Sequence, residues 1–143
     1  MTIRDMRLQD REIILDMMRV FYASPAVLSN GSEEIFRADV QACIEDNPYL
    51  QGYVMELDGE IIGYSMVAKS FSTEFGKRCI WIEDLYVLPE HRHKGYGSRM
   101  LQHIARSFPG CLLRLEVEAE NEKAIATYRK NGFEVLPYME MKK

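Results

Sequence analysis

The spacing of hydrophobic residues predicts two helices in the first third of the chain. Across residues 8–22, apolar side chains recur at positions 13, 14, 17, 18 and 21, which places them on one face of a helix. Ser24-Pro25 ends this helix, because a residue before proline disfavours the helical conformation. Ser32 can cap a second helix whose dipole favours the acids of its first turn, and Asn47-Pro48 ends it.

Alternating apolar and polar residues predict strands in the rest of the chain, beginning with a hairpin. Residues 51–57 and 60–68 flank Asp58-Gly59, a dipeptide favoured in two-residue turns because both positions accept positive φ. Further strands are predicted at residues 2–6, 79–87, 111–118 and 133–141, the last on an edge because it contains Pro137. Two more helices are predicted, at residues 95–108 and from Asn121 to Asn131-Gly132.

This order of elements predicts one mixed α/β domain over residues 1–143. No linker or repeat interrupts the order, and the length suits a single core. We expect a sheet of six or seven strands with about four helices on its faces. The strand-helix-strand unit over residues 79–118 should be a right-handed crossover between parallel strands.

Composition changes this picture only by excluding whole classes of protein. With 47% hydrophobic and 28% charged residues, the chain is neither disordered nor buried in a membrane. Its longest uncharged stretch, residues 20–32, is too short and polar to span a bilayer, and no secretory leader is recognisable. Cys43, Cys79 and Cys111 lack a CxxC spacing, so we expect reduced cysteines in a cytoplasmic protein without a metal site.

The charges are distributed unevenly although the net charge is only −4. Eight acidic residues and a single base, Arg37, lie between positions 33 and 60. Between positions 88 and 106, four bases oppose Glu90 alone. The basic segment is suited to an anion, or both segments are ordinary solvated faces. The acidic total disfavours nucleic acid as a partner, and no base-stacking motif is present.

The segment at residues 91–98, between a predicted strand and a predicted helix, has the properties of a phosphate-binding loop. The first turn of a helix offers unpaired N–H groups and the positive end of its dipole. Gly95 and Gly97 let a ligand approach the backbone closely, and Arg92 and Lys94 add positive charge. Two familiar phosphate loops do not fit: Met100 stands where a dinucleotide fingerprint needs glycine, and the Gly-Lys-Ser/Thr of a P-loop is absent.

The pattern Arg92-x-x-Gly95-x-Gly97, after a strand that ends Glu-Asp-Leu-Tyr-Val, resembles the GNAT superfamily of N-acetyltransferases. The predicted order of elements also resembles the GNAT acyl-CoA N-acyltransferase fold from end to end. A second family segment is matched by Leu115-Glu116-Val117, Asn121-x-x-Ala124, Tyr128 and Gly132-Phe133. Within the superfamily, residues 82–87 are most similar to diamine and polyamine acetyltransferases.

The resemblance implies acetyl-CoA as the acyl donor and assigns residues to its binding. Backbone groups of Leu85, Tyr86 and Val87 would pair with the pantetheine arm. Asn121 would contact the pantetheine or cap the next helix. The pyrophosphate would be held by Arg92 and by the N–H groups of His93, Lys94, Gly95, Tyr96, Gly97 and Ser98. His91 and His93 lack a third ligand nearby, so we expect no metal.

Two residues are candidates for proton transfer during attack of an amine on the thioester. Glu83 would act as the base through a water molecule, with Asp84 next, since neighbours on a strand face opposite sides. Tyr128, which the resemblance places near the thioester sulfur, would protonate the leaving thiolate. The alternatives are a solvated strand residue for Glu83 and a core aromatic for Tyr128. Direct transfer in a ternary complex is favoured over acetylation of Cys111.

The acceptor is expected to be a small cationic amine rather than nucleic acid or a membrane. By family analogy, residues 21–26 and the two early helices form its site, where aromatic rings together with Glu33 and Glu34 could select a cation. Ordinary helix amphipathicity explains the same residues. A protein lysine or N-terminus is the alternative substrate, and an acyl-CoA-binding module without turnover is the alternative function. The final strand is shorter than in many relatives, which leaves a homodimer open.

Overall fold

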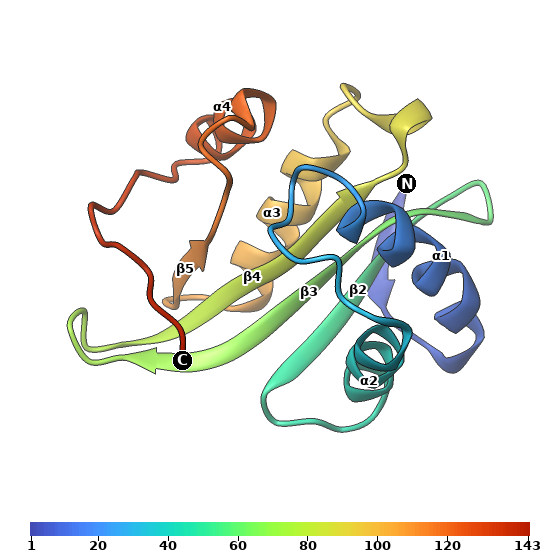
Figure 1. The fold of residues 1–143 in the computed structure, drawn as a ribbon, viewed down its shortest axis with the longest axis horizontal. Coiled ribbons are helices and arrows are strands. Elements are labelled where there is room, and N and C mark those ends of the chain that lie inside the picture. The colour runs from blue at the N-terminus through green and yellow to red at the C-terminus, as the bar shows by residue number, and fades with distance from the viewer.

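A computed structural model describes residues 1–143 and contains one five-stranded mixed sheet with four α-helices (Figure 1). The strands follow one another across the sheet in chain order, and only β4 and β5 are parallel. The strands are β1 (Thr2–Asp5), β2 (Leu50–Leu57), β3 (Glu60–Ser72), β4 (Lys77–Val87) and β5 (Leu112–Leu115). The helices are α1 (Arg11–Tyr22), α2 (Glu33–Ile44), α3 (Tyr96–Ser107) and α4 (Glu122–Lys130).

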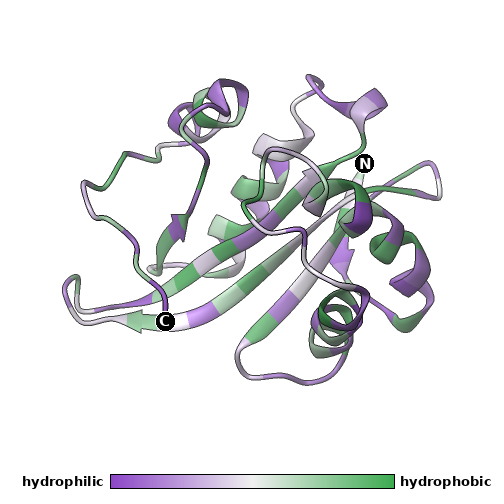
Figure 2. Ribbon diagram, viewed as in Figure 1, coloured by the Kyte–Doolittle hydropathy of each residue, from purple (hydrophilic) through white to green (hydrophobic).

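Helices cover both faces of the sheet and bury a separate apolar cluster on each. Helices α1 and α2 lie on one face, where Ile14 and Val40 are fully buried against the strands. Helix α3 lies on the other face and buries Met100 and Ile104. Figure 2 shows apolar residues along the central strands and polar residues on the outward sides of the helices. None of the helices has the length and apolar character needed to cross a membrane.

The predicted local signals for turns and helix ends are confirmed. Asp58 and Gly59 both have positive φ, 52° and 86°, in the tight turn between β2 and β3. The Ser32 hydroxyl accepts a hydrogen bond of 3.2 Å from the Ile35 N–H and so caps α2. Gly132, with φ of 87°, follows the end of α4. These signals were predictable because each depends on a few neighbouring residues.

The predicted parallel crossover through α3 is also confirmed, and it ends in a divergence of its two strands. Strands β4 and β5 pair only from Cys79 opposite Leu112 to Ile82 opposite Leu115. Beyond Ile82, β4 continues to Val87 without a neighbour on that side. The far half of this β4 edge is therefore free of strand pairing.

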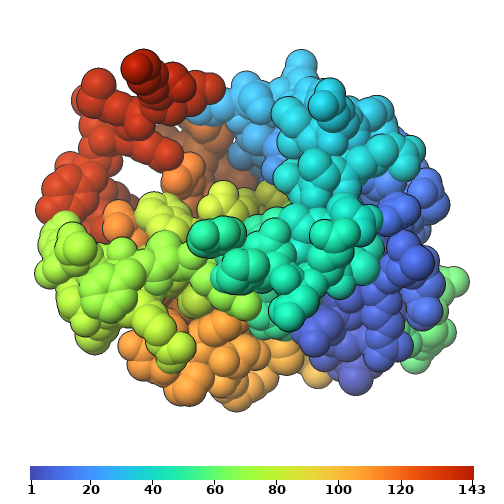
Figure 3. Space-filling model, turned by 90° about the horizontal axis from the view of Figure 1, so that it is seen from below, coloured from blue at the N-terminus to red at the C-terminus, as the bar shows by residue number.

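The prediction of a last strand at residues 133–141 was wrong, and the sheet has five strands rather than six or seven. Residues 134–143 make no backbone hydrogen bonds, although the Tyr138 hydroxyl donates to Glu74 at 2.9 Å. The neighbouring strand β5 spans four residues instead of the predicted eight, so it offers little edge for pairing, and Pro137 lacks an N–H. In Figure 3 this C-terminal segment bends around an opening beside the rest of the protein.

The hairpin of β3 and β4 is longer than predicted. The predicted strands stop at residue 68 and resume at residue 79, but in the structure both continue until Ser72 pairs with Lys77. The polar side chains there suggested a loop, but antiparallel strands can project beyond the core and pair with each other in solvent.

Candidate active site

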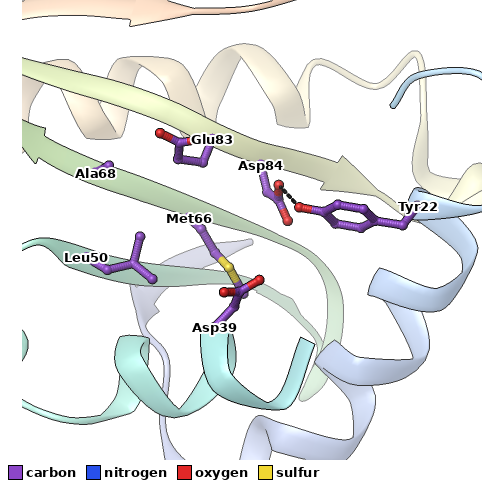
Figure 4. Close-up of a pocket in the computed structure, with 7 residues that line it drawn as sticks. All are labelled: Tyr22, Asp39, Leu50, Met66, Ala68, Glu83 and Asp84. Carbon is purple, nitrogen blue, oxygen red and sulfur yellow. Dashed lines mark hydrogen bonds between the residues drawn. The ribbon is translucent and has the colours of Figure 1, made fainter. Parts of the chain in front are cut away.

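Glu83 and Asp84 line the same cavity because β4 contains a bulge between them. Asp84 pairs with Met66 of β3, but the next residue, Val67, pairs with Ile82, so Glu83 has no partner. A bulge of this kind turns a side chain from its regular direction. The prediction that these neighbours face opposite sides was therefore wrong at this position. Figure 4 shows both carboxylates on the side of the sheet that carries α1 and α2.

This cavity of about 240 Å³ lies between the sheet and helices α1 and α2. It is lined by Tyr22, Asp39, Leu50, Met66, Ala68, Glu83 and Asp84, which include three acids and no base. A larger hollow of about 340 Å³ between the outer sides of α1 and α2 is lined by Arg11, Arg37, Ala38 and Gln41. That hollow has no carboxylate or nucleophile, so the smaller cavity is the candidate active site. Its charge suits a cation.

Asp84 is the most deeply buried of the three acids. Its side chain is buried, with 3% of the residue exposed, and each carboxylate oxygen accepts a hydrogen bond of 2.9 Å from a tyrosine hydroxyl. Tyr22 of α1 donates to one oxygen, and Tyr64 of β3 donates to the other. Burial raises the pKa of Asp84 to about 6, against the opposing effect of these two hydrogen bonds. Sequence analysis identified neither tyrosine, because the contacts join residues far apart in the chain.

Glu83 lies in the same cavity but is exposed. Partial withdrawal from solvent by the cavity walls raises its pKa, and the nearby charges of Glu140 and Asp39 add to the effect. A carboxylate with a raised pKa is a better proton acceptor than an ordinary surface glutamate. Glu83 is thus a cavity residue with a raised pKa that remains accessible to solvent.

The loop before α3 presents a row of free backbone donors. No N–H group from His93 to Ser98 donates a hydrogen bond to any other group of the protein. His93 and Gly95 have φ of 61° and 80°, which bends the chain into the first turn of α3. Six consecutive N–H groups without acceptors, at the positive end of a twelve-residue helix, suit a phosphate group.

Gly97 is a glycine that the protein itself does not require. Its φ is not positive, and a Cβ added to it would meet no atom within 4 Å. The other eight glycines each have either a positive φ or a neighbour too close for a side chain. The open space above Gly97 therefore fits a ligand that approaches the backbone, as a pyrophosphate does.

The free edge of β4 offers backbone groups at alternate residues. The Leu88 N–H donates to the Ile62 carbonyl at 2.9 Å, which fixes the alternation of the antiparallel ladder. By this alternation, the N–H and C=O groups of Leu85 and Val87 point away from β3, toward the edge of β4 where pairing with β5 has ended. Those of Tyr86 point toward β3. Of the three predicted pantetheine-binding residues, Leu85 thus has both backbone groups available for pairing, whereas Val87 has only its N–H, since its carbonyl accepts a hydrogen bond from Arg92.

The predicted arginine and serine of the loop make contacts within the protein. The Arg92 guanidinium lies over the Tyr86 ring, 5.4 Å from its centre, and its Nε donates to the Val87 carbonyl at 2.8 Å. The Ser98 hydroxyl accepts a hydrogen bond of 2.9 Å from the Asn131 amide. Asn131 ties the end of α4 to the loop, a role that its helix-ending position did not reveal.

The other two predicted site residues are Asn121, directly before α4, and Tyr128 of α4, across the divergence of β4 and β5 from the cavity (Figure 1). The Asn121 side chain accepts from the Ala124 N–H at 3.3 Å, so of its two expected roles the structure contains the helix cap. Tyr128 does not line the cavity; it packs on Phe133, with 6.0 Å between ring centres. Burial raises the pKa of Tyr128, which keeps its hydroxyl protonated at neutral pH.

Comparisons with known proteins place these features in a family. The model of the acetyltransferase (GNAT) family matches residues 14–133. The uncharacterized N-acetyltransferase YhfO of Bacillus subtilis is 32% identical over 142 residues, covering 94% of this chain and 90% of the relative. The thialysine N-epsilon-acetyltransferase of Sus scrofa is 35% identical over 112 residues, which are 71% of this chain and 64% of the relative.

Solved structures share the fold at lower sequence identity. A possible acetyltransferase from Clostridium difficile 630 superposes with a TM-score of 0.81 at 22% identity, covering 99% of this chain and 95% of that one. The aminoglycoside N-acetyltransferase AAC(6')-Iy, solved in complex with CoA, gives a TM-score of 0.80 at 17% identity and covers 99% of this chain and 93% of its own. The family match spans most of the chain and includes the loop, β4 and the cavity's carboxylates. The protein belongs to the GNAT family and is an N-acetyltransferase.

Proposed function

We propose that this protein transfers the acetyl group of acetyl-CoA to the primary amine of a small cationic molecule, by direct attack within a ternary complex. The observation that carries the proposal is the acidic cavity, which is lined by the adjacent carboxylates of Glu83 and Asp84. Both residues belong to the part of β4 whose outer edge has no strand partner. A cavity with three acids and no base attracts cations, and its 240 Å³ suits a small molecule better than a folded protein surface.

The donor fits the loop and strand edge described above. Acetyl-CoA would supply the activated thioester, and the CoA complex of AAC(6')-Iy supports this choice. The N–H groups of residues 93–98, with Arg92 and Lys94, would hold the pyrophosphate. The N–H and C=O groups of Leu85 and the N–H of Val87 would pair with the pantetheine arm, while the buried Tyr86 ring supports Arg92.

The reaction needs one proton acceptor and one proton donor. The amine nitrogen attacks the thioester carbonyl carbon, and the carbon–sulfur bond breaks as the amide forms. The proton lost by the nitrogen would pass through a water molecule to Glu83, whose raised pKa suits this task. Tyr128 would give its hydroxyl proton to the departing thiolate, as its protonated state at neutral pH allows.

A thiol-release assay with acetyl-CoA tests the proposal. The panel contains polyamines, aminoglycosides, lysine analogues, neutral amino acids and basic peptides, because relatives are named for thialysine and aminoglycosides. We expect amine-dependent thiol release with at least one small polycation and mass addition of one acetyl group to it. Release with peptides alone would assign a protein or peptide substrate. Tight acetyl-CoA binding without release to any amine would assign an acyl-CoA-binding module.

A further inference from the structure

We infer that Asp84 binds an ammonium group of the acceptor other than the amine that attacks the thioester, and that Tyr22 and Tyr64 are positioning residues that hold the Asp84 carboxylate for this purpose. The inference rests on the proposed function for the existence of an amine substrate. It separates two tasks within the cavity: Glu83 accepts a proton, whereas Asp84 fixes the acceptor.

The first observation is that Asp84 is a buried carboxylate without a cation. Buried charges in proteins are normally paired, since removal from water is costly. The side chains that face Asp84 are Tyr22 of α1, Asp39 and Cys43 of α2, Tyr64 of β3 and its neighbour Glu83. None of them carries positive charge, and no salt bridge of the protein includes Asp84. A cationic ligand in the cavity would supply the missing partner.

The second observation is that this carboxylate is fixed in direction. Its two oxygens are held by two hydroxyls from different elements, so the group cannot rotate without breaking a hydrogen bond. Each carboxylate oxygen can accept two hydrogen bonds, and each receives one from the protein. One acceptor position on each oxygen is therefore left for an N–H donor in the cavity that Asp84 lines.

The third observation is that the hydroxyls of Tyr22 and Tyr64 form hydrogen bonds with Asp84 and with no other group of the protein. Tyr22 is the last residue of α1 and itself lines the cavity, so its bond to Asp84 joins the helical side of the cavity to the sheet. Because hydroxyl donors favour the ionised carboxylate, both tyrosines lower the pKa of Asp84 from the value that burial alone would give.

The test measures kcat/KM for one fixed diamine from pH 5 to 9 with saturating acetyl-CoA. Asp84 must be ionised to hold an ammonium, so activity should fall as the pH decreases through its pKa. Tyr22→Phe and Tyr64→Phe each remove one donor without changing ring volume. Each should move this fall in activity, the acidic limb of the pH profile, to higher pH by roughly half a unit to one unit. Tyr49→Phe, which changes an exposed tyrosine outside the cavity, should leave the profile unchanged.

Asp84→Asn provides the second arm. It should raise the KM for the amine roughly tenfold or more while leaving the KM for acetyl-CoA unchanged. In the Asp84→Asn background, adding Tyr22→Phe should cause no further shift of the limb, since both changes act through one carboxylate. Circular dichroism and thermal unfolding of every variant confirm that the kinetics refer to folded protein.

Three results would overturn the inference. They are an acidic limb that stays in place in both tyrosine variants, an amine KM unaffected by Asp84→Asn, and calorimetric binding of Mg²⁺ or Mn²⁺ that requires Asp84 and is indifferent to the amine. Each of them leaves the proposed function intact if the wild type releases thiol with that amine. A wild-type protein that releases no thiol with any amine overturns the proposed function, and this inference with it.

Discussion

At the scale of single residues, binding of the two proposed ligands depends on opposite features of the protein. The acceptor cavity depends on atoms that are present: the carboxylates of Glu83 and Asp84 and the hydroxyls that hold the latter. The donor loop depends on atoms that are absent, because Gly97 leaves space that no part of the protein fills. Substitutions at the two places should therefore fail in different ways.

We expect Gly97→Val to lower the affinity for acetyl-CoA by roughly tenfold or more, because its side chain would occupy the space above the first turn of α3. Isothermal titration calorimetry measures this affinity. Gln102→Val, which puts the same side chain on an exposed position of α3, is the matched control and should bind normally. Equal affinities of the two variants would show that the donor does not approach Gly97.

Tyr128→Phe should lower kcat by roughly a hundredfold, the usual scale for an acid in proton transfer. The hydroxyl makes no hydrogen bond within the protein, and the ring keeps its contact with Phe133. Binding of acetyl-CoA and the unfolding temperature should therefore stay as in the wild type. The measurement is steady-state thiol release beside the Tyr49→Phe control, and a wild-type kcat would exclude Tyr128 as the acid.

At the scale of elements, one ion-pair network fastens the edge strand β1 to its surroundings. Arg4 of β1 donates to Asp10, which precedes α1, at 2.8 and 3.0 Å, and to Glu56 of β2 at 2.8 Å. Asp10 is buried and also accepts from the Arg7 N–H. Burial alone would raise the pKa of Asp10, but the hydrogen bonds from Arg4 and Arg7 outweigh it and hold that pKa below its usual value. Its stabilising effect is thus present at neutral pH and is lost as the pH falls below about 4.

Asp10→Ala should lower the free energy of unfolding at pH 7 by about 2–3 kcal/mol, because Arg4 loses its main partner. Denaturant titration measures the loss, which should shrink at acidic pH where Asp10 of the wild type is protonated. Asp16→Ala removes an exposed acid of α1 that also contacts an arginine, and it should change stability by no more than about 0.5 kcal/mol. Similar losses in both variants would contradict a special role for the network.

Elements that depend on local sequence were predictable, and those that depend on pairing were not. The helices, the Asp58-Gly59 hairpin and the parallel crossover follow from spacing and turn residues within short windows. The bulge at Glu83 arises from the way in which β4 pairs with β3. The pattern of residues within β4 alone does not predict it. The same is true of the contact from Tyr64, which lies 20 residues from Asp84 in the chain yet donates a hydrogen bond to its carboxylate. The loop at residues 93–98 was predictable because glycines and bases are grouped there.

At the scale of the whole molecule, stability is distributed unevenly between the sheet and the C-terminal segment. Strands β2 and β3 are paired on both sides, whereas residues 134–143 make no backbone hydrogen bonds and expose Val135, Met139 and Met141. Sequence alternation predicted a strand there, but a strand also needs a paired edge, and the four-residue β5 provides little of one.

Hydrogen exchange followed by mass spectrometry should show this contrast directly. Amides of residues 134–143 should exchange at rates close to those of an unfolded chain, while those of β3 are protected by several orders of magnitude. The two regions serve as controls for each other within one sample. Protection of the C-terminal segment that grows with protein concentration would show instead that a second copy of the chain covers it.

The divergence of β4 and β5 also has a kinetic consequence. Helices α1 and α2 bound the acceptor cavity on one face of the sheet, while the loop of residues 93–98 leads into α3 on the other. In the proposed reaction the amine and the thioester would therefore meet at the free β4 edge from opposite faces. Each ligand would then reach that edge from its own face, and we expect acetyl-CoA and the amine to bind in either order.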